Sequence, residues 1–484
     1  MKNKIRFDKM KLLKIIIVKP IKIFHNNGEI LMKKFLILAL LALNTTVYTQ
    51  IEKKTITLEK AIDMALKQNL NVIQARNNLN IQESSYLTTI GGLLPNLNAS
   101  GSFYRRQDWR PPTGTRQQFI PGFGFIDIPG TSGYSASNSY STSVSSSVTL
   151  FNGFANIANV NRALSNIKSS ENNYERTKQS IIYQTHQLYL NVVRTYQLMK
   201  VNEENLKRSQ RQLERIEESN RVGSVSLADV YRQRVATGND ELALINAQSN
   251  YEKAKADLAL FLSIDQYLDY EFDVTEFPTD IDTSEFNEII KKYSDVNSLF
   301  KQALLNRPDY KASENNLYSA SSSLTIARSG LYPSVSASAS YNLSNEQLSK
   351  ISDNRSLSFN LGISLPIFSG FQTKNAIEQA TINRNFASDQ LKQNERQILV
   401  DIQKAKLDIE AALKQLKVTQ TSVASAEMDL KIAEEKYNLG AGTLLDLLIA
   451  NANYINALSN KVNSVMSYLL SQKQMEYALG IINN

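Results

Sequence analysis

The strongest candidates for chemistry in this chain are two aspartates, Asp229 and Asp446, which occupy matching places in a repeated pattern. Each follows a hydroxyl residue by three positions, Ser226 in the first case and Thr443 in the second. That spacing is a variant of the capping box, in which the two side chains bond to free backbone N–H groups at the start of a helix. A carboxylate in the first turn also interacts favourably with the helix dipole. These aspartates can therefore act electrostatically, through their negative charge. We predict that a helix starts at each of them.

The composition excludes most catalytic chemistry. The 484 residues include no Cys and two His, so thiol catalysis, disulfides and multi-His metal sites cannot be built. The sequence also lacks the G-x-S-x-G nucleophile motif and the Walker A motif. No pattern in the sequence places two carboxylates together in an apolar pocket. We expect no enzyme, no cofactor and no metal site.

Both aspartates lie in a stretch that the chain repeats. Phe151 to Leu262 recurs 217 positions later as Phe368 to Leu479. A repeat of this length indicates a duplicated half-protein rather than a solenoid. The matching landmarks include Gly153 with Gly370, Phe154 with Phe371, Gly223 with Gly440, and Asp229 with Asp446.

Each copy predicts a long helical hairpin. Neither Gly nor Pro occurs between Gly153 and Gly223 or between Gly370 and Gly440, and apolar residues recur there every three or four positions. A helix over such an interval would be roughly 105 Å long, so it must pack along its length as a coiled coil. Gly223 and Gly440 are suited to end these arms. We therefore predict hairpins over residues 154–262 and 371–479.

The N-terminal segment has the pattern of a secretory signal peptide. Met32-Lys33-Lys34 precedes a short apolar run that is too short to span a membrane as a helix. We place the signal peptide within residues 1–49, with cleavage near Gln50, Met32 as the real start and 1–31 as an upstream extension; the alternative is a tethered N-terminus. Residues 1–49 carry the whole net charge of +8. The mature chain is then near neutral, and its charge does not indicate nucleic-acid binding.

Short alternating stretches predict four β-strands, in pairs over about 97–150 and 334–367. Apolar residues alternate with Ser and Asn, and charged residues are absent from most of these polar positions. Strands of about ten residues with this pattern are typical of transmembrane β-barrels. A soluble sheet also alternates, but it does not normally place Ser at nearly every polar position. With a helix before each pair, the structural repeats become 50–262 and 298–484.

Two other segments break the repeat. Residues 105–133 are rich in Pro, Gly and aromatic residues and predict a loop on the extracellular side, either idle or a surface for binding. Residues 263–297 are acidic around Pro278 and predict a connector between the halves, packed outside the body. A solvated acidic linker is the simpler interpretation of this connector, and a cation site is the alternative.

The predicted elements indicate a conduit. Four strands cannot close a transmembrane barrel, and open sheet edges are not tolerated in lipid. Several copies must then share one barrel, while the hairpins, joined to the strands at Gly153 and Gly370, form a helical cylinder on the periplasmic side. The fold class is thus mainly α with membrane β. The rival hypothesis is a secreted coiled-coil scaffold, which would not need the four strands.

The residues resemble the TolC-like outer membrane efflux proteins over about Leu58 to Gly480. The resemblance rests on the duplication, on Ala303 to Tyr310 (ALLNRPDY), on the turns before Gly153 and Gly370, and on the tip from Tyr437 to Leu448. It implies a homotrimer with a twelve-stranded barrel and a helical tunnel, in the outer membrane of a Gram-negative bacterium. The implied partners are lipid, a periplasmic adaptor and an inner-membrane pump of the RND or ABC type. Small-molecule efflux and type I protein secretion both fit.

The resemblance also implies roles for the hairpin tips, which would close the periplasmic entrance. Asp446 aligns with an acidic ring at the constriction, Tyr437 with a gate tyrosine, and Asp229 with a partner in the first tip. For Asp446 the pore role and simple capping both stay open, whereas capping is favoured for Asp229. Gly442 and Ile449 stand where the best-known members carry a gate arginine and a second acidic ring, which argues against the same arginine latch. The adaptor-docking positions would be Gly223, Ser224, Gly440, Ala441 and Gly442.

Overall fold

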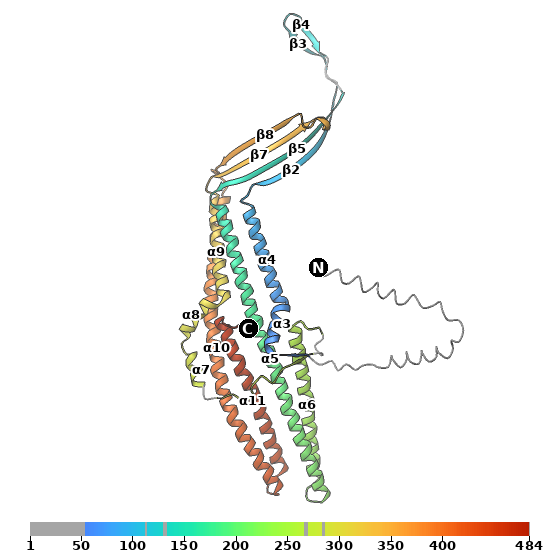
Figure 1. The fold of residues 1–484 in the computed structure, drawn as a ribbon, viewed down its shortest axis with the longest axis vertical. Helices are drawn as coiled ribbons and strands as arrows, with labels where there is room; N and C mark the ends of the chain where they lie inside the picture. The colour runs from blue at the N-terminus through green and yellow to red at the C-terminus, as the bar shows by residue number, and fades with distance from the viewer. Residues whose placement is uncertain (1–53, 112–113, 129–132, 266–269, 283–285, 484) are drawn as a thin grey trace, which may run out of the picture. The chain divides into compact units, whose positions relative to one another are not determined.

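The computed structural model describes residues 54–111, 114–128, 133–265, 270–282 and 286–483. The predicted signal peptide, its extension and the cleavage site lie outside these residues. Residues 55–484 form one compact unit. Within it a β-sheet stands at one end, and two helical hairpins end together at the other (Figure 1).

The order of elements repeats from one half to the other. The first half contains β1 (Lys54–Ile56), α3 (Leu58–Gln68), α4 (Leu70–Gly91), β2 (Asn96–Arg110), β3 (Arg116–Ile120), β4 (Gly124–Ile128), β5 (Gly133–Asn152), α5 (Ala155–Arg221) and α6 (Leu227–Phe261). The second contains β6 (Tyr270–Phe272), α7 (Phe286–Lys292), α8 (Val296–Asn306), α9 (Pro308–Ser329), β7 (Ser334–Asn345), β8 (Arg355–Ser364), α10 (Gln372–Asn438) and α11 (Leu444–Leu479). Helices α5 and α10 are both 67 residues long, as expected for duplicated arms.

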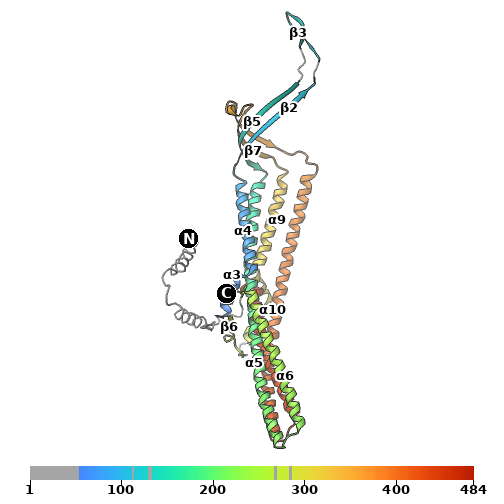
Figure 2. The same cartoon turned by 90° about the vertical axis from the view of Figure 1, so that its right-hand side faces the viewer.

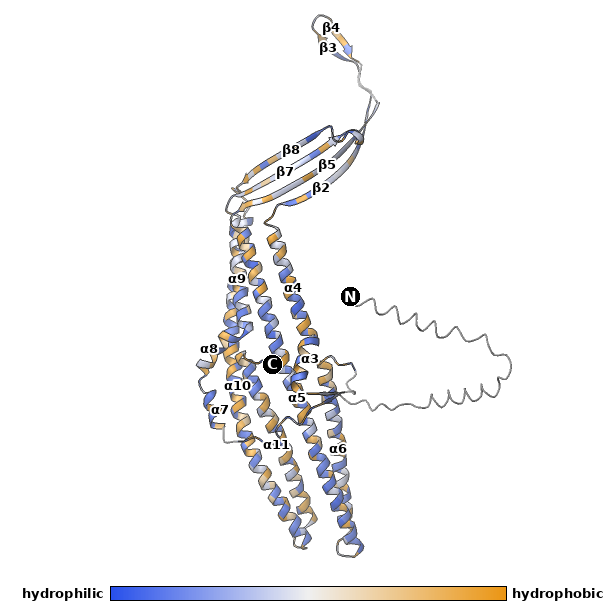
Figure 3. Ribbon diagram, viewed as in Figure 1, coloured by the Kyte–Doolittle hydropathy of each residue, from blue (hydrophilic) through white to orange (hydrophobic). Residues whose placement is uncertain are grey.

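The four predicted strands form one antiparallel sheet in the order β2-β5-β7-β8. The two strand pairs have equivalent registers: Phe103 lies opposite Tyr140, and their repeat equivalents Tyr341 and Leu357 also pair. Because side chains alternate along a strand, one face carries these apolar residues and the other carries Ser and Asn. Cross-strand hydroxyl pairs such as Ser100 Oγ with Ser143 Oγ, at 2.8 Å, lie on the polar face. Figure 3 shows this mixing of polar and apolar residues along the strands.

The loop predicted over residues 105–133 is wrong for most of its length. Strand β2 continues to Arg110 and pairs with β5 up to Gly133, and β3 and β4 form a further hairpin (Figures 1 and 2). Cross-strand aromatic pairs stabilise a sheet, and here the rings of Phe119 and Phe125 lie 5.2 Å apart. Two of the glycines that suggested a loop, Gly122 and Gly124, lie at the β3–β4 turn, where both have positive φ.

The helices share a main core where α3, α5, α6, α8, α10 and α11 meet; Tyr189, Leu258, Ile402 and Met475 are among its buried side chains. A separate tip core joins the ends of both hairpins and consists of Ile216, Val230, Leu430, Leu444, Leu447 and Ala450. None of the helices in the described ranges is both long enough and apolar enough to cross a membrane.

The connector over 263–297 differs from the predicted solvated linker. Its apolar residues Phe272 and Phe286 are buried in the main core. The hydroxyl of Tyr189, on α5, lies 2.9 Å from the carbonyl oxygen of Ile56 and 2.7 Å from that of Asp273, and its one hydrogen is shared between these two acceptors. Because apolar residues alternate with the acidic ones, the segment packs on the helices while acidic residues such as Glu276 and Asp280 are exposed.

Candidate functional site

The hairpin tips are short turns fixed by local hydrogen bonds. Helix α5 ends before Gly223 and α10 before Gly440, and both glycines have positive φ, 78° and 71°. Gly tolerates this left-handed conformation, which is common just after a helix. The N–H groups of Ser224 and Ala441 donate to carbonyl oxygens of the preceding helices, each at 2.9 Å. The prediction that these glycines end the helices is confirmed.

The predicted helix caps are also confirmed. Ser226 Oγ accepts from Asp229 N at 3.3 Å and donates to Asp229 Oδ2 at 2.7 Å. In the second tip Thr443 Oγ1 accepts from Asp446 N, and both Thr443 N and Thr443 Oγ1 donate to Asp446 Oδ2, which completes a reciprocal capping box. The two aspartates are thus held by their own helix starts whatever else they do.

The two carboxylates sit in different surroundings. Hydrogen bonds from the Thr443 hydroxyl and N–H lower the pKa of Asp446, so this exposed group is ionised at neutral pH. Asp229 is half-buried and forms an ion pair with Arg232 at 3.1 Å. Asp446 therefore offers an exposed negative charge, whereas much of the charge of Asp229 is already compensated.

Tyr437 and Asp229 line one cleft of about 1120 Å³ between the two tips, together with Gly440 and Gly442. Burial and the negative charge of Asp229 raise the pKa of the Tyr437 phenol. The buried Tyr437 hydroxyl has no hydrogen-bond partner among the residues that the structure describes. The tips thus bring two of the three predicted gate residues, Tyr437 and Asp229, to the same cleft without a direct hydrogen bond between them. Asp446 does not line this cleft.

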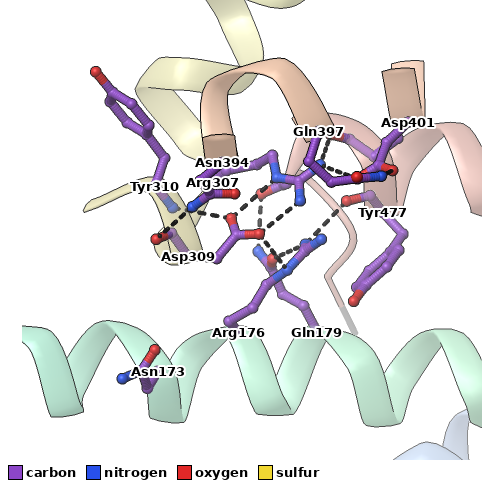
Figure 4. A network of polar contacts seen from close by, with 12 residues as sticks. Asn173, Arg176, Gln179, Arg307, Asp309, Tyr310, Asn394, Gln397, Asp401 and Tyr477 are labelled. Atoms are coloured by element: carbon purple, nitrogen blue, oxygen red, sulfur yellow. Dashed lines mark hydrogen bonds and ion pairs between the residues drawn. The ribbon is translucent and has the colours of Figure 1, made fainter. Parts of the chain in front are cut away.

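A buried ionic network that the sequence did not predict joins several helices outside the tips. Figure 4 shows its side chains from close by. Arg307, only 3% exposed, donates to both carboxylate oxygens of Asp309 at 3.0 and 2.6 Å and to Asp401 at 3.1 Å. From α5, Arg176 contacts Asp309 at 3.5 Å and lies 3.8 Å from the ring centroid of Tyr477. The network ties together α5, the start of α9, α10 and the end of α11. Its only sequence signal was Arg307 and Asp309 flanking Pro308, noted as a family mark.

The surroundings of Asp309 keep its carboxylate ionised at neutral pH. Burial alone would raise the pKa of Asp309, but the hydrogen bonds from Arg307 and the charge of Arg176 outweigh it, and the pKa is lowered. A lowered carboxylate pKa contributes stability that is present above the ordinary pKa and is lost as the pH falls through the folded-state value. The network is therefore fully formed at neutral pH. In the described ranges, no three His, Cys, Asp or Glu side chains are grouped so that they could hold a metal ion.

Both copies of the repeat match a known protein family. A family model described as outer membrane efflux protein matches residues 61–263 and 299–481. Outer membrane protein TolC of Escherichia coli (strain K12) is 24% identical over 323 residues, which cover 64% of this chain and 63% of TolC. The probable efflux pump outer membrane protein TtgC of Pseudomonas putida is 23% identical over 425 residues, covering 87% of this chain and 82% of TtgC.

Solved structures share the fold. The Campylobacter jejuni CmeC outer membrane channel superposes with a TM-score of 0.71 at 22% identity, covering 87% of this chain and 85% of CmeC. The outer membrane protein VceC of Vibrio cholerae gives a TM-score of 0.71 at 19% identity, covering 87% and 96%. The predicted fold class, with paired helical hairpins joined to strands, is confirmed.

Proposed function

Because the chain belongs to the outer membrane efflux protein family, we propose that it is the outer membrane channel of a tripartite efflux system in a Gram-negative bacterium. It would conduct substrates passively from an inner-membrane pump and periplasmic adaptor to the exterior, with no catalytic activity of its own. The observation that carries the proposal is the direct passage from a two-faced sheet into 67-residue helices, through one tight corner in each half. Efflux is favoured over type I protein secretion because relatives such as TtgC are named as efflux pump components.

The sheet supports a barrel shared by three copies. Strands β2 and β8 are its edges, and neither has a second partner within the described residues. Unpaired edges are not tolerated in lipid, and three copies would supply twelve strands. The apolar face, with Phe103, Val144 and Leu361, would then meet lipid, and the Ser and Asn face would line the lumen.

The duplication predicts how neighbouring copies pair. Within the chain, β5 pairs with β7 so that Ser147 lies opposite Ser338. The repeat equivalents of these two residues are Ser364 on β8 and Ser100 on β2, which lie on opposite edges of the sheet. A pseudo-symmetric barrel would therefore set Ser364 of one copy opposite Ser100 of the next. Within one copy these strands are separated by β5 and β7, roughly 14 Å at 4.8 Å per strand, which is too far for a disulfide.

We expect the double variant Ser100→Cys/Ser364→Cys to form disulfide-linked dimers and trimers under mild oxidation in membranes. The chain has no native Cys, so every link would report this pair. The matched control is Tyr104→Cys/Ser364→Cys, which keeps the same polar face but is displaced by four residues along β2 and should link poorly. Equal linking of both variants, or none in membrane-inserted protein, would contradict the shared barrel.

At the tips we propose a cation-attracting entrance. Three copies of Asp446 would form a ring of exposed, ionised carboxylates. Tyr437 and Asp229, which line the cleft between the two tips, would take part in closing them. The exposed turn residues Gly223, Ser224, Gly440 and Ala441, with the half-buried Gly442, would meet the adaptor.

Asp446→Asn should reduce cation selectivity and weaken block by divalent cations in planar-bilayer recordings, because it removes the charge of the ring. Asp446→Glu keeps the charge and is the control that should retain both properties. If Asp446→Asn leaves cation selectivity and divalent block unchanged, the role of Asp446 is limited to capping its helix. A parent protein that stays soluble without detergent and conducts no ions would instead favour a coiled-coil scaffold.

A further inference from the structure

The two hydrophobic cores of the helical body are separated by a long interval. On α5 the main core ends at Val193 and the tip core begins at Ile216, about 35 Å further along the helix axis. On α11 the corresponding gap runs from Val465 to Ala450. Apolar contacts that hold helices rigidly together are therefore concentrated above and below this interval. The side chains in this interval therefore decide how rigidly the tip core is coupled to the main core.

The part of this interval next to the tip core holds a polar layer that consists of the buried Asn205, Ser209 and Gln233 and the half-buried Thr237, Asp240 and Asn451. Asn451 Nδ2 donates to Asn205 Oδ1 at 2.9 Å, and Asn205 Nδ2 donates to Asp240 Oδ1 at 2.8 Å. Gln233 Nε2 donates to Ser209 Oγ at 3.1 Å. Asn205, Ser209 and Gln233 are buried, at 4%, 7% and 1% exposure. Leu206 is the one large apolar side chain buried beside them on α5.

Two acceptors in the layer are left over. Gln233 Oε1 and Asn451 Oδ1 are buried and have no hydrogen-bond partner in the described part of the chain. Both residues line a cavity of about 40 Å³ between the four helices. One water molecule needs roughly 10–15 Å³ by this kind of measure, together with polar partners. The cavity has the size and the lining for internal water.

The charges around the cavity favour water over an ion. Arg208 and Arg215 line it together with Asp240 and Glu434, so the charges balance. A bound cation or anion would give this neutral cavity a net charge. A water molecule is uncharged and can donate to both Gln233 Oε1 and Asn451 Oδ1.

We infer that the polar layer is a hydrated hinge about which the tip core tilts as a unit relative to the main core. The inference rests on the proposed channel function, because it names the element that would let the entrance open. Separating apolar surfaces exposes them to water at a cost, whereas these amides and hydroxyls exchange protein partners for water with little net loss. The layer is thus a place between the two cores where bending costs little.

The test replaces the leftover acceptors by apolar side chains of similar size, in Gln233→Met/Asn451→Leu. A dry layer should hold the tip in one position, because a bent state would then expose apolar surface. Spin labels at Ser224→Cys in the tip and Ser298→Cys on α8 report the tilt in the full chain, which has no other Cys. We expect a broad distance distribution in the parent and a narrow one in the dry variant. Channel openings should become about tenfold rarer, because the free energy associated with one buried polar group changes the population of the bent state by about that factor.

The matched control is Gln248→Met/Asn453→Leu, which changes exposed residues of the same types on the same two helices and should match the parent. If the dry variant does not fold, the single change Asn451→Leu at a half-buried position makes the same test. Equal distance distributions in parent and dry variant would overturn the hinge, and so would a broader distribution in the dry variant. If the parent conducts no ions but its distribution still narrows on drying, the channel proposal fails while the hinge stands.

Discussion

Arg307→Met should lower the free energy of unfolding by about 3–5 kcal/mol, the usual cost of removing one partner from a buried ion pair. Arg307 is 3% exposed and satisfies Asp309 and Asp401 at once. Without it, Asp309 would keep Arg176, at 3.5 Å, and the backbone N–H of Tyr310, while Asp401 would keep only its hydrogen bond from the uncharged Gln397. Native proteins are stable by only about 5–15 kcal/mol. We therefore expect a large drop in the thermal unfolding midpoint, followed by circular dichroism, and a loss of folded protein from the membrane fraction.

The control for this change is Lys311→Met, one turn further along α9 at an exposed position, which should leave the midpoint nearly unchanged. A second check is Arg307→Met combined with Asp309→Asn. Removing one orphaned charge should recover part of the loss, so the two effects should not add. If Arg307→Met unfolds at the same temperature as Lys311→Met, the network does not hold the halves together.

The features that could be predicted from the sequence are those whose partners lie close together in the chain. The caps at Asp229 and Asp446 depend on residues three positions away, and the long helices depend on uninterrupted periodicity. The strands of the sheet could be predicted from the alternation of apolar residues with Ser and Asn. The duplication provided a second copy of each of these sequence patterns. In every case the controlling contacts fall within one element or one hairpin.

The features that could not be predicted depend on distant partners or on competing local signals. Arg307 meets Asp401 and the end of α11, far away in the sequence, so no spacing rule connects them. The β3–β4 hairpin was missed because several Pro and Gly residues outweighed a short alternation of Phe and Ile. The polar layer was missed because Asn205 and Gln233 look like ordinary surface residues until the four helices are assembled.

Gly153→Ala should be much more damaging than Gly370→Ala, although the two glycines are repeat equivalents. Both lie at the corner between strand and helix with positive φ, 61° and 56°. An alanine in this conformation costs about 1–2 kcal/mol at either site. A Cβ at Gly153 would also lie 2.7 Å from Ser329 O and 2.8 Å from Tyr332 Cβ, whereas one at Gly370 meets nothing within 4 Å in its own chain. We expect a further loss of about 1–3 kcal/mol for Gly153→Ala, as for overpacking.

The asymmetry has a structural reason that makes the comparison informative. Gly153 is covered by the junction of α9 and β7 in its own chain, while Gly370 follows the edge strand β8. The repeat equivalents of Ser329 and Tyr332 are Gly91 and Leu94, at the junction of α4 and β2. In the proposed trimer this junction would come from the next copy and would cover Gly370. Gly370→Ala should therefore leave each chain folded by circular dichroism, with only the backbone cost of about 1–2 kcal/mol, but reduce the fraction that migrates as trimer on native gels. Full trimer assembly by Gly370→Ala would mean that the neighbouring copy does not pack on this corner.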